Sequence, residues 1–212
     1  MLIVFEGLDG VGKSTIVNGV VNYFSAKHMR TPSPILKQVR SKCSEISVKA
    51  EEALFDFCNV LASEQLHNDN SNLVICDRYI ISTEARRIAL KCTDSPNLYS
   101  ELSKWSWHPS IYKPTICIHL CLEEYERQQR VRNRGEMTLD ERKLNSDPRY
   151  RAALLTAYSE LCDITIDLTS LKESQAISYV IDCLENLLPK LSEIKTSKFE
   201  NEEVSPDELY LF

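Results

Sequence analysis

The amino-acid sequence predicts an α/β fold of three layers, α/β/α, in which helices cover both faces of a parallel sheet of about five strands. Continuous apolar runs recur along the chain, the clearest being Leu2–Phe5, Leu73–Cys76 and Ile116–Leu122. Strands that are buried on both faces have this pattern, whereas strands with one solvated face alternate. Helical stretches separate the runs, as they do in βαβ units. A length of 212 residues suits one domain with a complete core.

The elements follow from local patterns in chain order. The strand at Leu2–Phe5 comes first because its apolar residues lead directly into a glycine-rich loop. The other strands are expected at Lys27–Arg30, Leu73–Cys76, Ile116–Leu122 and Ile164–Ile166. The helices are expected at Ser14–Ala26, Ile46–His67, Ser82–Lys91, Glu123–Asn133, Arg149–Leu161 and Leu171–Leu188. Residues 1–190 are therefore expected to form the domain, and residues 191–212 a loosely held acidic tail.

Composition narrows the classes of partner. The net charge of −6 argues against a protein that binds nucleic acid by neutralising phosphates, which needs a basic face. No apolar stretch approaches the roughly 20 residues that cross a bilayer, so no membrane partner is expected. Eight cysteines are scattered without a CxxC pair, which favours reduced thiols over a disulfide framework. We expect a cytoplasmic protein; a mitochondrial location is left open, although the chain has no transit peptide.

The segment Gly7–Ser14 matches the phosphate-binding pattern GxxxxGK[ST] without deviation. Glycines let successive backbone N–H groups point at phosphate oxygens, and the helix that follows adds its positive N-terminal end. Lys13 is expected to reach the β- and γ-phosphates, and the Ser14 hydroxyl to bind Mg²⁺. The pattern therefore predicts a P-loop that binds ATP and Mg²⁺ as cofactors. The expected nucleotide-binding residues are Gly7, Leu8, Asp9, Gly10, Val11, Gly12, Lys13, Ser14 and Thr15.

A second acidic group follows the apolar run Leu73–Cys76, where the sequence reads Asp77-Arg78-Tyr79. Ligands bind at the carboxyl ends of strands in open α/β sheets. Asp77 is therefore expected to hold Mg²⁺ together with Ser14, and Arg78 to bind a phosphate in a bidentate way. The alternative is a structural Asp–Arg pair at the end of a strand.

Arginines are concentrated between Glu123 and Gly135, and this stretch predicts a short lid over the phosphates. The alternative is a solvated helix face, because Glu123 and Glu126 each precede an arginine by four residues. We therefore expect a structural role for Arg127. The candidates for the lid are Arg130 and Arg134, with Arg132 as a further nucleotide-binding residue.

These motifs together resemble those of the thymidylate kinase family. Glu6–Thr15 fits the family pattern EGxDGxGKST, and Asp77-Arg78-Tyr79 with Ser82 fits DRYxxS. The resemblance covers roughly Met1 to Leu188. Within the family the chain looks most similar to the mitochondrial UMP-CMP kinase branch. The features that carry this finer likeness include Thr31-Pro32-Ser33-Pro34, Arg40, Phe55, Phe57, Asn59, Trp107, Arg134-Gly135, Tyr150-Arg151 and Tyr158.

The resemblance implies transfer of the γ-phosphoryl group of ATP to a pyrimidine nucleoside monophosphate, either dTMP or UMP, CMP and their deoxy forms. It implies that Asp9 touches the sugar and phosphate end of the acceptor, and that Arg40 and Arg78 bind its phosphate. Ser82 is expected beside the acceptor. An aromatic residue of the long helix stacks on the base in relatives; we favour Phe57 slightly over Phe55. We also expect a homodimer that binds small-molecule nucleotides.

The sequence departs from the family pattern at Arg86 and Arg87, where relatives place a tyrosine and its neighbour. This departure leaves base choice and discrimination at the 2′-hydroxyl open, and it suggests extra positive charge near the acceptor phosphate. Two alternatives stay in view: a nucleotide-binding regulatory protein with an altered acceptor site, and a nucleoside kinase.

Overall fold

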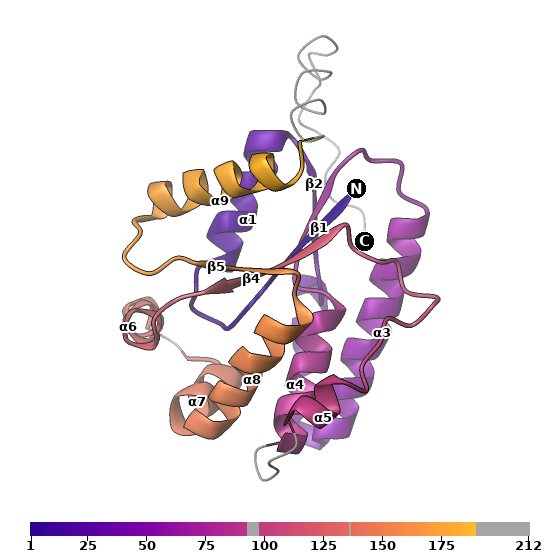
Figure 1. Cartoon of the computed structure of the whole chain (residues 1–212). Coiled ribbons are helices and arrows are strands. Elements are labelled where there is room, and N and C mark those ends of the chain that lie inside the picture. The colour runs from indigo at the N-terminus through magenta and orange to yellow at the C-terminus, as the bar shows by residue number, and fades with distance from the viewer. Residues whose placement is uncertain (93–97, 136, 190–212) are drawn as a thin grey trace.

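A five-stranded parallel sheet lies at the centre of the computed structural model, which describes residues 1–92, 98–135 and 137–189 (Figure 1). The strand order is β2-β3-β1-β4-β5, so the N-terminal strand occupies the middle. The strands are β1 (Leu2–Glu6), β2 (Lys27–Arg30), β3 (Val74–Asp77), β4 (Ile116–Cys121) and β5 (Ile164–Asp167). The predicted three-layer α/β/α fold and its parallel sheet are confirmed.

Helices cover both faces of the sheet. Helices α1 and α9 pack together on one face, and α3, α4 and α8 pack on the other (Figure 1). The helices of the described residues are α1 (Lys13–Phe24), α2 (Lys37–Ile46), α3 (Val48–His67), α4 (Ile80–Cys92), α5 (Leu98–Leu102), α6 (Glu124–Arg134), α7 (Leu139–Ser146), α8 (Pro148–Leu161) and α9 (Glu173–Leu187), with a short 3-10 helix, η1, at Pro34–Leu36.

The apolar runs form the interior strands because these strands are covered on both faces, as the pattern indicated. Every residue of β1 is buried, because the strand has a helix layer on each face and a strand on each side. The edge strand β2 has mostly exposed residues and a polar sequence, KHMR. All eight cysteines are free thiols, as expected, and Cys76 and Cys117 lie buried in the central strands.

The helix expected at Ile46–His67 is α3, which begins at Val48, and the helix before it, α2, was not expected. Ser47 has an extended backbone between α2 and α3, and its side-chain oxygen accepts a hydrogen bond from the backbone N–H of Ala50, which caps α3. A serine at this position satisfies one of the N–H groups that a helix start leaves without a partner. Helix α2 was missed because its sequence is largely polar, and apolar residues such as Val39 and Ile46 are exposed rather than packed in the core.

The expected acidic tail, residues 191–212, lies outside the described residues. Among the helices that are described, none is long and apolar enough to cross a membrane.

Candidate active site

The loop between β1 and α1 has the backbone geometry of a phosphate cradle. Gly7, Gly10 and Gly12 all have positive φ angles, of 136°, 92° and 98°. A Cβ atom at Gly7 would overlap the carbonyl oxygen of Leu120 on β4, so a side chain is excluded there by packing as well as by conformation. The loop ends at the N-terminus of α1, whose free N–H groups favour an anion.

Lys13 is buried at the centre of this loop. Its Nζ donates hydrogen bonds to the carbonyl oxygens of Gly7 (2.9 Å) and Leu8 (2.7 Å). Burial, and after it the positive charge of Arg78, lower the pKa of Lys13 from 10.5 to about 8. The ammonium group is therefore held inside the loop. A phosphate bound there would supply a negative charge next to it and raise its pKa again.

Ser14 and Asp77 come together at the carboxyl edge of the sheet, as the sequence predicted. The Ser14 hydroxyl donates to Asp77 Oδ2 at 3.0 Å. Asp77 is buried, and among the described residues its Oδ1 atom has no hydrogen-bond partner. A hydroxyl and a buried carboxylate suit Mg²⁺, which takes few protein oxygens and completes its shell with phosphates and water. The described residues contain no cluster of three or more His, Cys, Asp or Glu that could hold a metal ion.

A first cavity of about 670 Å³ lies over this loop. Two arginines of α6 border it: Arg130 donates from Nη1 to the carbonyl oxygen of Val11 at 3.1 Å, and Arg134 lies one turn further along the helix. The volume falls in the range of small-molecule sites. The lining residues are Asp9, Gly10, Val11, Gly12, Lys13, Ser14, Thr15, Ile16, Arg30, Asp77, Arg78, Arg130, Val131, Arg134, Leu168, Leu171, Lys172, Glu173 and Ala176.

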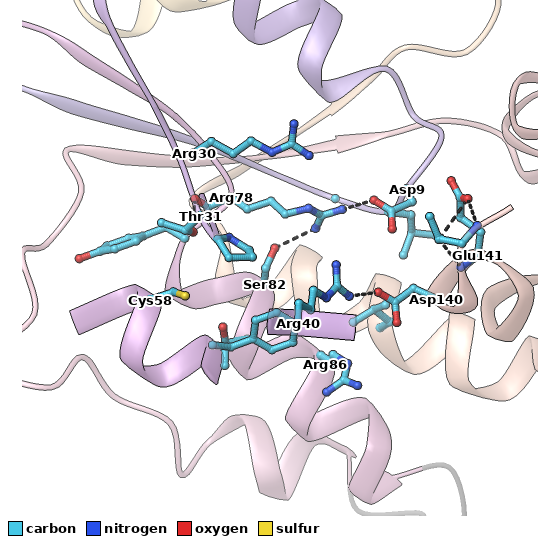
Figure 2. A pocket seen from close by; sticks show the side chains of 18 of the residues that line it. Asp9, Arg30, Thr31, Arg40, Cys58, Arg78, Ser82, Arg86, Asp140 and Glu141 are labelled. Carbon is cyan, nitrogen blue, oxygen red and sulfur yellow. Dashed lines mark hydrogen bonds and ion pairs between the residues drawn. The ribbon is translucent and has the colours of Figure 1, made fainter. Parts of the chain in front are cut away.

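A second cavity, of about 470 Å³, lies beside the first between the sheet edge and helices α2, α3, α4, α7 and α8 (Figure 2). The two cavities share four lining residues, Asp9, Arg30, Arg78 and Arg134. One carboxylate and three guanidinium groups therefore stand at the junction. The residues that line only the second cavity include Arg40, Phe55, Asn59, Ser82, Thr83, Arg86, Asp140, Glu141, Tyr150 and Tyr158.

Arg78 is the most highly connected residue at the junction. Its Nη2 donates to Asp9 Oδ1 at 2.5 Å, and its Nη1 donates to Ser82 Oγ at 2.9 Å and to the hydroxyl of Tyr158 at 3.2 Å (Figure 2). Although burial opposes it, the adjacent Arg78 guanidinium holds the pKa of Asp9 well below its usual range. Arg78 has a positive φ of 69°, a left-handed conformation that residues other than glycine seldom adopt.

Glu6 holds the segment from Tyr79 to Ser82 in place through hydrogen bonds. Its side chain is fully buried at the end of β1 and accepts hydrogen bonds from the backbone N–H groups of Tyr79 (2.9 Å) and Ser82 (3.2 Å), and from the Ser82 hydroxyl. Burial raises the pKa of Glu6 from 4.5 to about 7. The carboxyl group thus anchors the start of α4, which carries Ser82 to the junction.

We expect Glu6→Gln to be more stable than the wild type, by a margin that grows as pH rises from 4.5 to about 7. In this window the folded protein holds a proton on Glu6 that the unfolded chain releases, so wild-type stability falls as pH rises, by up to about 3 kcal/mol. Glutamine has no proton to lose; its amide oxygen can keep the two backbone hydrogen bonds, while its amide nitrogen would donate to the Ser82 hydroxyl. Urea unfolding across this pH range measures the difference. The exposed Glu160→Gln serves as control, and a pH-independent difference for Glu6→Gln would contradict the prediction.

Several predicted site residues have positions that differ from expectation. Phe57, slightly favoured as the base-stacking residue, is 59% exposed and does not line the second cavity, whereas Phe55 lines it. The physical reason is that positions two apart on a helix point to nearly opposite sides. Arg132 lies on the exposed side of α6, where it donates to Gln128, and it lines neither cavity.

The remaining arginines separate clearly. Arg127 is fully buried and bonds Glu124, Asn145 and the carbonyl oxygen of Asp9, which agrees with the structural role expected for it. Arg40 lines the second cavity but is bound to Glu51 and Asp140, and Arg134 is bound to Glu141 (Figure 2). An acceptor phosphate would therefore compete with carboxylates for Arg40.

Sequence reasoning missed Arg30, which lines both cavities. Its Nε lies 3.8 Å from Asp77 Oδ2. A signal was present, because Arg30 ends a predicted strand, and the register pairs it with Asp77 at the same edge. The role of Glu6 beneath Ser82 was also missed. A buried acid at the end of β1 has no pattern of its own beyond its place in the motif.

Comparison with known proteins identifies the family. The family model for thymidylate kinase matches residues 5–176. The chain is 28% identical over 182 residues to a thymidylate kinase from Mycoplasmopsis agalactiae, covering 77% of this chain and 82% of that protein. It is 26% identical over 145 residues to a probable thymidylate kinase from Thermoplasma acidophilum, covering 64% and 72%. A thymidylate kinase structure from Candida albicans has the same fold, with a TM-score of 0.67, 21% identity and coverage of 88% and 91%. The chain therefore belongs to the thymidylate kinase family and is a nucleoside monophosphate kinase.

Proposed function

We propose that this protein transfers the γ-phosphoryl group of ATP, bound with Mg²⁺, to the phosphate of a pyrimidine nucleoside monophosphate, with dTMP as the first candidate. The observation that carries the proposal is the junction of the two cavities at Asp9, Arg30, Arg78 and Arg134. Two anionic substrates that bind on either side of this junction meet at a cluster of guanidinium groups. Such a cluster suits phosphoryl transfer between two phosphates, because it offsets their mutual repulsion.

On the donor side, the P-loop N–H groups and Lys13 would hold the β- and γ-phosphates of ATP. Bound Mg²⁺ would supply charge neutralisation between those phosphates, and Ser14 and Asp77 are the residues that would hold it. Arg130 lies next to the loop and Arg134 at the junction, so both would add positive charge near the group in transfer. These residues therefore bind and orient the donor without taking part in covalent chemistry.

On the acceptor side, Arg78 and Arg30 would hold the monophosphate at the junction. A phosphate oxygen of the acceptor would bond to the γ-phosphorus of ATP while the bond to the β,γ-bridging oxygen breaks, leaving ADP. No general base is required, because the attacking oxygen is already an anion at neutral pH. The chain supplies position and charge, which are the main contributions of proteins to this reaction.

The choice of acceptor rests on the relatives and on the cavity. The curated relatives named above are described as thymidylate kinases, which favours dTMP. The finer likeness to the UMP-CMP kinase branch rests on sequence motifs alone and keeps UMP, CMP and their deoxy forms as candidates. All of these are pyrimidine monophosphates, and a cavity of about 470 Å³ is within the range for ligands of this size.

An assay of ADP release over a panel of acceptors tests the proposal. The panel contains dTMP, dUMP, UMP, CMP, GMP and AMP, with thymidine and deoxycytidine as nucleoside controls. We expect turnover that requires a pyrimidine monophosphate and stops when EDTA removes Mg²⁺. Turnover with the nucleosides alone would indicate a nucleoside kinase, and the absence of acceptor-stimulated turnover at millimolar concentrations would leave a nucleotide-binding protein; either result would contradict the proposal.

We also propose that the chain forms a homodimer through the outward face of α3. Phe57, Val60 and Leu61 have the spacing of one helix face and are 59%, 51% and 44% exposed. An exposed apolar face of this kind is typical of an interaction site, and a second copy of the chain can cover it with the same face. Analytical ultracentrifugation is expected to give a dimer that Phe57→Ser weakens. A monomer at micromolar concentration would contradict this assembly.

A further inference from the structure

Arg86 occupies the second cavity at a distance from the phosphate junction. It lies on α4 one helical turn beyond Ser82, which itself contacts Arg78. A residue four positions further along a helix lies about 6 Å further from the end. Because Arg78 and Arg86 line the same cavity, a monophosphate whose phosphate meets Arg78 can place its base beside Arg86. The neighbouring Arg87 points elsewhere, since it pairs with Glu84 and Asp56 and does not line the cavity.

The guanidinium group of Arg86 is held in a defined position. Its Nη2 donates to Glu51 Oε2 at 2.5 Å, and its Cζ lies 5.5 Å from the centre of the Phe55 ring. Glu51 is buried and also accepts a hydrogen bond from Arg40 Nε at 3.1 Å, so a single carboxylate fixes both arginines. Only 17% of the Arg86 side chain is exposed. A charged group held this way before the ligand arrives loses little freedom when it binds.

The chemistry of this group restricts the base. A guanidinium carries five N–H donors and no acceptor. Among the described residues, Glu51 is the hydrogen-bond partner of Arg86, so the other N–H groups remain for a ligand. Uracil and thymine present a carbonyl oxygen at C4, which accepts a hydrogen bond, whereas cytosine presents an amino group there, which donates. Glu51 does not line the cavity, and both of its oxygens are already bonded to arginines, so it offers little to that amino group.

We propose that Arg86 is a specificity-determining residue, which selects an acceptor base with a carbonyl at C4, as in dTMP, dUMP and UMP, over the cytidine monophosphates. This inference rests on the proposed function and deepens it. Glu51 acts as a positioning residue, because it contacts the arginine and not the base. The departure from the family pattern at this position thus contributes a donor to the base-binding end of the site.

Comparing dUMP with dCMP tests the proposal, because the two bases differ only at C4, which bears a carbonyl or an amino group, and in the proton on N3. The wild type is expected to prefer dUMP in kcat/KM. Arg86→Gln is expected to reduce the ratio of the two kcat/KM values by about 10- to 150-fold, the range for loss of one hydrogen bond to a charged group. Arg87→Gln, the neighbouring arginine outside the cavity, is the matched control and is expected to leave the ratio unchanged.

Two further variants keep the test decisive if Arg86→Gln does not fold. Arg86→Lys retains the charge without the planar fork, and Glu51→Gln removes the anchor while leaving Arg86 in place; both are expected to lower the ratio in part. A wild type that prefers dCMP, or variants that keep the wild-type ratio, would overturn the role of Arg86. Failure of the proposed function looks different, because no acceptor monophosphate would then stimulate ADP release by the wild type.

Discussion

Replacing Lys13 with alanine is expected to lower kcat by at least about 10²- to 10³-fold, the loss typical for one preorganised donor at a developing charge. Lys13 is the cation at the centre of the P-loop, and its ammonium group is already held by Gly7 and Leu8 where the donor phosphates would bind. The fold is expected to persist, because removal of a buried charge offsets the loss of its two hydrogen bonds. Steady-state kinetics and thermal unfolding measure the two effects separately.

The ionisation of Lys13 adds a second signature of the same role. Because its pKa in the free protein is lowered to about 8, the ammonium form is present below this pH and is lost above it. Wild-type kcat/KM for ATP is therefore expected to fall as pH rises through about 8. Lys27→Ala is the control, since Lys27 pairs with Asp69 on an exposed edge of the sheet. Retained activity in Lys13→Ala would refute the assignment of the loop.

Replacing Arg78 with alanine is expected to lower kcat/KM for the acceptor by about 10²- to 10³-fold or more. Arg78 lines both cavities and connects Asp9, Ser82 and Tyr158, so its loss removes a phosphate ligand and the organiser of its neighbours. Affinity for ATP is expected to change much less, because the P-loop holds the donor. Acceptor kinetics together with calorimetric titration of ATP measure the two affinities.

Two comparison variants sharpen the Arg78 experiment. Arg78→Lys keeps a positive charge but not the planar fork, and it is expected to recover only a small part of the lost activity. The exposed Arg149→Ala removes an arginine from α8 outside both cavities and is expected to behave as wild type. An Arg78→Ala enzyme that keeps its acceptor kcat/KM, or that loses ATP binding instead, would contradict the placement of the acceptor phosphate.

The sheet was predictable from sequence because its signals are local. Each interior strand is a continuous apolar run, and this pattern arises directly from burial on both faces. The helical regions were less predictable where packing contributes little. Helix α2 is polar and mostly exposed, so burial leaves little pattern to mark it, whereas the helix expected from Ile46 coincides closely with α3.

The acceptor side was harder to predict than the donor side for a related reason. Helix α3 carries one apolar stripe with Phe55, Cys58 and Ala62, which is buried, and another with Phe57, Val60 and Leu61, which is exposed. Both stripes have helical spacing, so the pattern does not say which face turns toward the cavity. The same ambiguity applied to Arg86 and Arg87, which differ by about 100° around α4.

The sequence by itself determined the phosphate chemistry of this protein. In Gly7–Ser14 the glycines, the lysine and the helix start are contiguous, and the function of the loop depends on backbone geometry that those residues impose locally. Only the tertiary structure decided which distant residues meet at the junction. Asp9, Arg30 and Arg78 follow or end three different strands, and they come together because parallel strands β1, β2 and β3 end at one edge. The rotation of α3 and α4 against that edge then selected Phe55 and Arg86 for the acceptor cavity, a choice set by packing across the whole domain.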